Sequence, residues 1–421
     1  MTPVTGGQPD GGAFTSAALN KSGAGASAAD GRKRAIAAGV KGDFDAAAAA
    51  EEGAGALAGR PAPRKPKDAF VKNCDKYHGP STPHGYIEAR FAWCTKWVAW
   101  KETRDRRGRL IAYHAVHYYQ IGYGRDDGQR SVRIYLKPYK VIARGRAASL
   151  STPFGFVPVC KQASSTPGCA VDKPMVTKSL AQWKAQDLAN KWTTWTISSD
   201  ENQSSATDKV SFHRFTFQFS TGVQTTPQSA DYMLRCDSAQ IGARTKACVF
   251  HDIVPNLKYA LYKANGSRTT VHEVARHVKD AFQHPDAANM YPKENHPKKI
   301  PGRYTGSVDP DTPDWLERVP YNGTDYKANS NTKNHACHRT GPYRLTGLPS
   351  PPGSGQQCDE YPFASTKQGA ANPTWDFSVR AVSKDDNHAA GQALKKFYRQ
   401  WRILYLDNDF FYVDVVNKMP R

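Results

Sequence analysis

Short runs of β-branched and aromatic residues follow one another between residues 71 and 240, with polar turns between them. The runs are Phe91–Lys101, Leu110–Tyr123, Ser131–Ala143, Lys191–Ile197 and Val210–Phe219. The last two come close to a strict alternation of apolar and polar residues, which is typical of strands with one buried face. Because no long helical pattern interrupts these runs, the region predicts an antiparallel sandwich or barrel.

The pattern changes after residue 240 and mixes helices with strands. Val271, Val274, Val278 and Phe282 stand three, four and four residues apart, which predicts an amphipathic helix over 270–283. Residues 285–355 are rich in Pro, Gly, Asn and Asp, so we expect long irregular loops there. Further elements are expected as strands at Cys358–Ser365, Phe377–Val382 and Phe410–Val416 and as a helix at about His388–Trp401. The fold class is therefore α+β.

The chain begins with a different composition, dominated by Ala, Gly and small polar residues up to about residue 68. Such a segment has little apolar surface to bury, and Arg60–Lys67 resembles an extended basic linker. We therefore expect a disordered tail over 1–70, a β-rich accessory domain over 71–240 and a second domain over 241–421. The 421 residues suffice for two such domains.

Charge narrows the class of partner. The formal net charge is +20, which favours polyanions: nucleic acid, anionic cell wall or anionic lipid. Arg104, Arg106 and Arg107 belong to the segment 86–146, whose net charge is +9, and are candidate substrate-binding residues between aromatic strands. A merely solvated basic face explains the same pattern. No apolar run is long enough to span a membrane.

Eight cysteines form local successive pairs without any CxxC or zinc-ligand spacing. They are Cys74, Cys94, Cys160, Cys169, Cys236, Cys248, Cys337 and Cys358. An even number in local pairs suits four structural disulfides, which would imply export; free buried thiols are the alternative. Because 1–23 shows no signal-peptide pattern, the native leader is missing here or export uses another route.

The candidate chemistry is concentrated between Cys358 and Asn387. Asp359 and Glu360 begin a short aromatic strand, and Asn387 stands just before the last predicted helix. If the two strands form a hairpin crossed by that helix, the three side chains can surround one oxygen-preferring cation. The alternative is structural: residues 385–387 cap the helix, and the carboxylates lie in a turn.

These residues resemble the NucA/NucB family of secreted bacterial deoxyribonucleases. The resemblance rests on Cys358–Ser365, Ser378–Val382 and Asp386–Gly391, and it extends upstream to Arg276–Pro285. It covers about 245–421, less than half of the chain. Residues 71–240 resemble no family that we can name.

The resemblance implies a ββα-metal nuclease core related to the HNH endonucleases, with one divalent cation, Mg²⁺ or Mn²⁺. Asn387 falls on the family's metal ligand, while Asp359 and Glu360 fall on its acidic pair, which supplies the general base and a second metal contact from Glu360. Which carboxylate is the base stays open. Arg380 is expected to contact the scissile phosphate or support the fold, and His277 to be catalytic or structural. His388 is a weaker candidate for substrate binding.

We therefore expect an exported, monomeric, metal-dependent endonuclease that cuts DNA with little sequence preference. RNA as a second substrate and an immunity protein as a partner stay open, as does the role: nutrition, breakdown of extracellular DNA, or a toxin against competitors. The alternative is a binding protein whose β-rich domain recognises a cell surface or glycan and whose nuclease domain is vestigial.

Overall fold

The computed structural model describes ten segments of the chain, which fall into two units. The segments are 3–9, 62–77, 84–88, 90–161, 168–222, 225–227, 231–241, 245–306, 313–405 and 409–419. The units are Met1–Ile253 and Val254–Arg421. Unit 1 extends past residue 240 because β13 (Ala247–Phe250) pairs with β12 (Tyr232–Asp237), and the Cys236–Cys248 disulfide joins the two strands.

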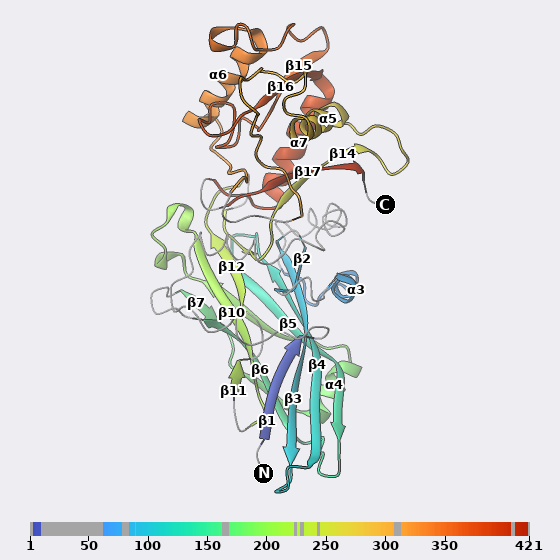
Figure 1. Ribbon diagram of the computed structural model, residues 1–421. Helices are drawn as coiled ribbons and strands as arrows, with labels where there is room; N and C mark the ends of the chain where they lie inside the picture. The colour runs from blue at the N-terminus through green and yellow to red at the C-terminus, as the bar shows by residue number, and fades with distance from the viewer. Residues whose placement is uncertain are drawn as a thin grey trace. The chain divides into compact units, whose positions relative to one another are not determined.

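Unit 1 contains two antiparallel sheets (Figure 1). One has the order β1-β3-β4-β5-β9-β7, with β2 beside β3: β1 (Pro3–Pro9), β2 (Tyr86–Glu88), β3 (Ala92–Arg104), β4 (Leu110–Gly124), β5 (Ser131–Arg144), β7 (Cys169–Val171) and β9 (Thr193–Ser199). The other has the order β13-β12-β10-β6-β8, with β11 beside β10: β6 (Pro153–Lys161), β8 (Val176–Ser179), β10 (Ser211–Ser220) and β11 (Thr225–Pro227) complete it. All five strands expected from the apolar runs are present.

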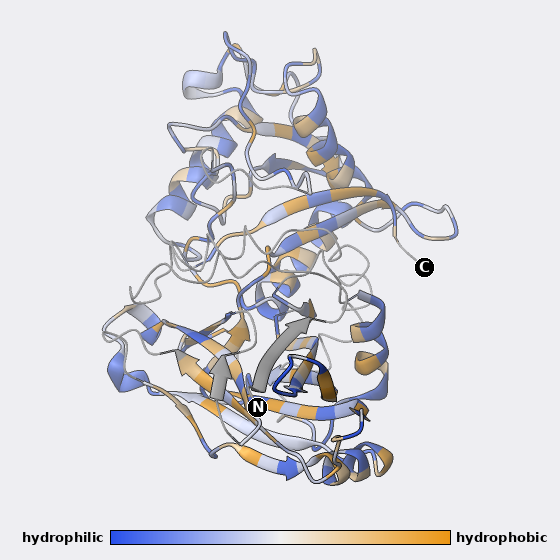
Figure 2. Ribbon diagram, turned by 60° about the horizontal axis from the view of Figure 1, so that its bottom comes forward, coloured by the Kyte–Doolittle hydropathy of each residue, from blue (hydrophilic) through white to orange (hydrophobic). Residues whose placement is uncertain are grey.

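Aromatic rings from the two sheets meet in the interior of unit 1. The Trp93 ring lies 5.6 Å from that of Phe215 and 4.6 Å from that of Tyr232, so β3 packs against β10 and β12. Hydrophobic and hydrophilic residues both occur along the strands of unit 1 in Figure 2, and on β10 the phenylalanines at 215, 217 and 219 alternate with polar residues. Packing of two sheets through alternating inward residues is the arrangement of a sandwich, as the strand pattern predicts. Unit 1 also contains two short helices, α3 (Asp68–Tyr77) and α4 (Leu180–Leu188).

The segment predicted to be disordered, 1–70, lies largely outside the described residues. Within it, Pro3–Pro9 forms β1 and pairs antiparallel with Trp97–Thr103 of β3, and α3 begins at Asp68. Composition does not predict such a strand, because the pairing uses backbone groups and not side chains. The edge of a sheet offers unpaired N–H and C=O groups with which any extended segment can pair.

The described residues of unit 2 form three α-helices and two pairs of strands. The helices are α5 (His272–Gln283), α6 (Thr324–His338) and α7 (Lys384–Gln400). β14 (Asn256–Tyr262) pairs parallel with β17 (Tyr412–Lys418), whereas β15 (Gln356–Tyr361) pairs antiparallel with β16 (Ser378–Ser383). Five α-helices therefore lie in the described part of the chain, and none has the length and apolar character needed to cross a membrane.

Helix α6 corrects the prediction of irregular loops over 285–355. Its Asn, Ser and Thr residues have weak helix propensity, so tertiary contacts hold it. Buried Asn329 donates to the carbonyls of Ala364 and Thr366 and accepts from the Ala371 amide. The contact requires a glycine at 369, because a Cβ there would lie 2.4 Å from Asn329 Nδ2.

Candidate active site

The hairpin β15–β16 and helix α7 bring the two separated motifs of the sequence together. Asp359 stands opposite Arg380, and Glu360 stands opposite Val379. Helix α7 begins at Lys384, directly after β16, so Asn387 lies in its first turn instead of before the helix as predicted. The two antiparallel strands and the helix that follows them therefore hold Asp359, Glu360 and Asn387 on adjoining elements.

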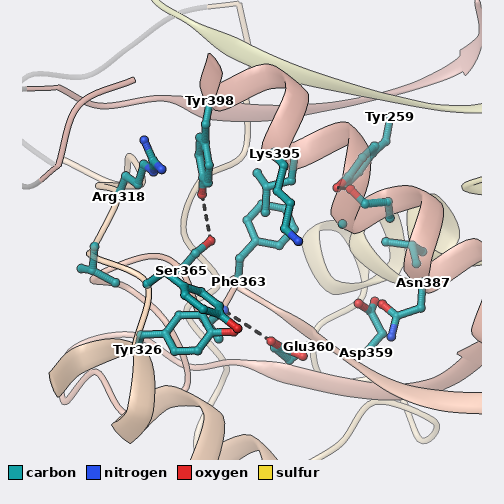
Figure 3. Close-up of a pocket in the computed structure, with 17 residues that line it drawn as sticks. Tyr259, Arg318, Tyr326, Asp359, Glu360, Phe363, Ser365, Asn387, Lys395 and Tyr398 are labelled. Atoms are coloured by element: carbon teal, nitrogen blue, oxygen red, sulfur yellow. Dashed lines mark hydrogen bonds between the residues drawn. The ribbon is translucent and has the colours of Figure 1, made fainter. Parts of the chain in front are cut away.

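Asp359, Glu360 and Asn387 line one pocket of about 370 Å³ in unit 2 (Figure 3). In this view Asp359 and Asn387 lie next to each other, and Glu360 lies on the side of Tyr326. The pocket is also lined by Tyr259, Val274, Arg318, Val319, Tyr321, Tyr326, Phe363, Ala364, Ser365, Ala390, Gly391, Leu394, Lys395 and Tyr398. Two carboxylates from β15 and one amide from α7 therefore line the same pocket.

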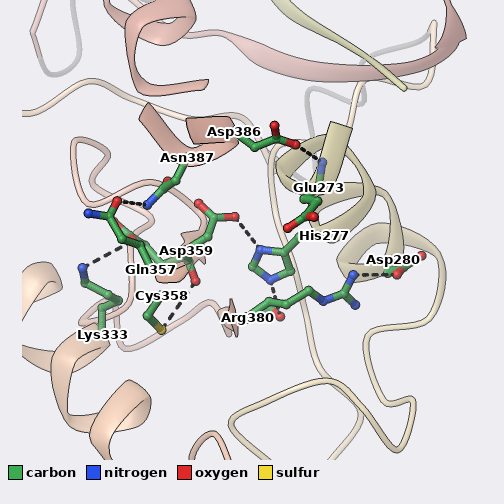
Figure 4. Close-up of polar contacts among 12 residues, drawn as sticks. Glu273, His277, Asp280, Lys333, Gln357, Cys358, Asp359, Arg380, Asp386 and Asn387 are labelled. Carbon is green, nitrogen blue, oxygen red and sulfur yellow. Dashed lines mark hydrogen bonds and ion pairs between the residues drawn. The ribbon is translucent and has the colours of Figure 1, made fainter. Parts of the chain in front are cut away.

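Helix α5 fixes the orientation of Asp359. His277 is fully buried; its Nδ1 lies 2.6 Å from Asp359 Oδ2, and its Nε2 lies 2.9 Å from the Ser378 hydroxyl (Figure 4). Because both ring nitrogens are engaged and the ring has no exposed surface, His277 does not reach the pocket. It acts on the pocket through Asp359, so the structure places it in a supporting position.

Glu360 is the carboxylate with the more perturbed environment. The pKa of Glu360 is raised to about 7. Burial is the main cause and the neighbouring Asp359 carboxylate adds to it, whereas Lys333 acts in the opposite direction. Lys333 Nζ lies 3.7 Å from Glu360 Oε2, and the Ala364 amide donates to Oε1 at 3.4 Å. Its side chain keeps 19% of its surface exposed, so it remains accessible from the pocket.

The start of α7 is tied to the start of α5 by two reciprocal hydrogen bonds, of which Figure 4 shows the one between Asp386 and Glu273. Asp386 Oδ2 accepts from the Glu273 amide at 2.7 Å, and Glu273 Oε2 accepts from the Ser383 amide at 2.5 Å. Each acid satisfies a backbone donor at the other helix's N-terminus. Asn387 follows directly, and its Nδ2 donates to Gln357 Oε1 at 3.2 Å. The structural alternative, in which residues 385–387 cap their own helix, does not describe Asp386 or Asn387, because Asp386 accepts at the start of α5 and Asn387 bonds Gln357.

Two other predicted residues lie outside the pocket lining. Arg380 donates to Asp280 Oδ2 of α5 at 2.8 Å and contacts Met290 Sδ, which is the fold-supporting alternative. His388 is exposed on α7.

The basic turn belongs to unit 1, whereas unit 2 builds the acidic pocket. Arg104, Arg106 and Arg107 lie at the β3–β4 hairpin and are exposed. Asp105 accepts from the Arg107 amide, and Arg104 pairs with Glu102 at 2.7 Å, so part of the local charge is compensated.

Sequence reasoning missed the side of the pocket that Arg318, Tyr321 and Tyr326 form. Arg318 and Tyr321 stand in an irregular segment, and Tyr326 stands on α6, within the region expected to be loops. No spacing or motif linked these residues to Glu360; only the long-range contacts of α6 do so.

The comparison with protein families confirms the resemblance in the C-terminal region. Residues 314–413 match the family described as Deoxyribonuclease NucA/NucB. The matched segment contains Asp359, Glu360 and Asn387, whereas His277 precedes it. Neither the curated proteins nor the solved structures gave a match to this chain. The matched region supports a deoxyribonuclease, which is a hydrolase that acts on DNA.

The donor set in the pocket suits a hard cation. Among the described residues, no three His, Cys, Asp or Glu side chains gather at ligand spacing. The pocket instead offers two carboxylates and one amide, which are the oxygen ligands that Mg²⁺ takes while keeping several water molecules. The set fits one weakly held ion and does not fit a closed structural site.

Proposed function

We propose that unit 2 hydrolyses phosphodiester bonds of DNA with one divalent cation, Mg²⁺ or Mn²⁺, and little sequence preference. The observation that carries this proposal is the convergence of Asp359, Glu360 and Asn387 on one pocket inside the region that matches the deoxyribonuclease family. Asp359 and Asn387 would hold the cation, because their side chains are neighbours in Figure 3. This differs from the expectation that Glu360 is the second ligand.

The residues of the chain then have separate roles. A bound cation supplies Lewis-acid stabilisation of the charge that develops on the phosphate. Glu360 accepts the proton of the attacking water, a task for a pocket carboxylate within hydrogen-bond reach of that water. Lys395 lines the same pocket, and its positive charge stabilises the negative charge that develops on the phosphate. His277 orients Asp359, as hydrogen-bonded partners of metal-bound carboxylates do.

A plasmid assay tests the function directly. The full chain should degrade heat-denatured plasmid DNA, and more slowly the supercoiled plasmid, with Mg²⁺ or Mn²⁺, and EDTA should abolish the cutting. Degradation should also fall steeply with salt, since the substrate is a polyanion and the chain carries a net charge of +20. If both the denatured and the supercoiled plasmid stay intact with every metal, the proposal is overturned and the binding-protein alternative is favoured. Cutting that survives EDTA would overturn the metal dependence.

We further propose that the protein works in an oxidising compartment outside the cytosol. The support is four disulfides between successive cysteines: Cys74–Cys94, Cys160–Cys169, Cys236–Cys248 and Cys337–Cys358. Mass spectrometry of the protein isolated from its host should find no alkylatable thiol without prior reduction. Eight free thiols would contradict this.

A further inference from the structure

One end of the candidate pocket is aromatic. Tyr321 and Tyr326 line the same pocket as Glu360, with ring centroids 4.8 Å apart and planes inclined by 59°. Tyr321 is 69% exposed, although large aromatic side chains are usually buried. Its ring therefore contributes little to the core, and its exposed face is available to a ligand that enters the pocket.

Cationic groups line the pocket together with these rings. Lys395 of α7 is exposed, and Arg318 is held by the Ile403 carbonyl and by stacking on the Tyr398 ring at 4.6 Å. In Figure 3, Arg318 and Tyr326 lie on one side and Asp359 and Asn387 on the other. Cations beside stacking rings are the combination by which proteins bind single-stranded nucleic acid.

We propose that Tyr321 and Tyr326 form a nucleobase subsite, in which one base adjacent to the scissile phosphate stacks on the Tyr321 ring. The inference rests on the proposed function and specifies its substrate: single-stranded or locally unpaired DNA. The phosphate of the same nucleotide would lie toward Glu360 and Lys395, which line the same pocket.

Stacking on Tyr321 favours this substrate class. The bases of a duplex are stacked and paired inside the helix, so a base that remains in the duplex does not offer its face to the tyrosine ring. A duplex must extrude the base before it can enter, and that extrusion costs free energy that a single strand does not pay. Every base presents a π-face, so stacking on tyrosine is compatible with low sequence preference.

A double-mutant cycle tests the proposal by removing the Tyr321 ring from the enzyme and the base from the substrate, singly and together. The substrates are single-stranded oligonucleotides with one cleavable phosphodiester, the other linkages being phosphorothioates, and with either an intact or an abasic residue on each side of that bond. The enzymes are the full-length wild type, Tyr321→Ala and Tyr321→Phe. The control is Tyr262→Ala, which removes a 37%-exposed tyrosine outside the pocket lining.

Tyr321→Ala should lower kcat/KM on the intact strand roughly 5- to 100-fold, the range for losing one stacked base. Tyr321→Phe and Tyr262→Ala should cut near the wild-type rate. The abasic substrate should be poor for the wild type at one of the two positions, and there Tyr321→Ala should cause no further loss. Wild type should also prefer the single strand to a duplex of the same sequence.

The outcomes separate this inference from the function on which it rests. If wild type cuts the intact and abasic strands equally, or if Tyr321→Ala cuts like wild type, the subsite is overturned while the nuclease assignment stands. If the loss of kcat/KM caused by Tyr321→Ala multiplies with the loss caused by the abasic substrate, the ring and the base act independently. The subsite is then also overturned. If the wild type cuts no DNA with any metal, the proposed function itself fails.

Discussion

The imidazole Nδ1 of His277 lies 2.6 Å from Asp359 Oδ2, and neither side chain is more than 9% exposed. The contact joins helix α5 to strand β15 across 82 positions of the chain. A carboxylate held in this way has one orientation in the pocket, and it keeps that orientation without spending free energy at the moment of reaction. The pair therefore links the packing of unit 2 to its proposed chemistry.

His277→Ala should reduce both stability and turnover. The change leaves Asp359 and the Ser378 hydroxyl without their buried partner, which should cost about 1–3 kcal/mol of the free energy of unfolding. Because Asp359 then loses its orientation, kcat should fall at least about 10-fold while KM changes little. Ser378→Ala is the control and should affect stability more than kcat. A folded His277→Ala variant that cuts at the wild-type rate would show that the contact is only structural.

The strands and the C-terminal motif were predictable because their signals are local. Runs of β-branched and aromatic residues predicted β3, β4, β5, β9 and β10, and the acidic and amide residues between Cys358 and Asn387 predicted the candidate site. Helix α6 was not predictable, since it depends on hydrogen bonds from Asn329 to segments more than 30 residues away. The aromatic side of the pocket was missed for the same reason, because Tyr326 stands on that helix.

Asn329→Ala should destabilise unit 2 by about 1–3 kcal/mol, because two backbone carbonyls and one amide lose their buried partner. Those backbone groups follow Asp359 and Glu360 along the chain, so cleavage should weaken as well. Thermal unfolding of the two proteins gives the comparison. Asn331→Ala on the same helix replaces an exposed residue and should change stability by less than about 0.5 kcal/mol. Equal effects of the two substitutions would contradict the assigned role of Asn329.

The disulfide beside the pocket should matter more for activity than one in unit 1. Cys337–Cys358 joins α6 to the residue before Asp359, and closing a loop of this length contributes about 3 kcal/mol in the chain-entropy model. The double variant Cys337→Ser/Cys358→Ser should lower both the Tm of unit 2 and plasmid cutting. The matched variant Cys160→Ser/Cys169→Ser removes a disulfide of unit 1 and should leave the cutting rate unchanged under folding conditions. Equal losses of activity would refute this.

Unit 1 should lose stability in acid through His213. Burial, with a further effect of Arg130, lowers the pKa of this histidine to about 4, and its Nε2 lies 2.7 Å from the Ser199 hydroxyl. Between pH 6.5 and 4 the unfolded chain binds the proton that the folded chain does not, so stability falls as pH falls, by up to about 3 kcal/mol. Hydrogen exchange of β10 peptides at pH 7 and pH 4.5 measures this. His213→Gln should flatten the dependence; an unchanged slope would exclude His213 as its source.

The acidic pair and Asn387 give the most direct test of the pocket. Asp359→Asn and Glu360→Gln replace a carboxylate by an amide of nearly equal volume, and Asn387→Ala removes a proposed cation ligand. Glu360→Gln should lower turnover by roughly 10²–10⁴ without changing the metal concentration required, because it removes the proposed base. Asp359→Asn and Asn387→Ala should instead raise the Mg²⁺ or Mn²⁺ concentration needed for half-maximal rate, since both alter ligands. Asn387→Ala should cost at most about 1 kcal/mol of stability, because it removes one exposed hydrogen bond, to Gln357 Oε1. If all three variants cut plasmid at the wild-type rate and metal requirement, the pocket is not the active site.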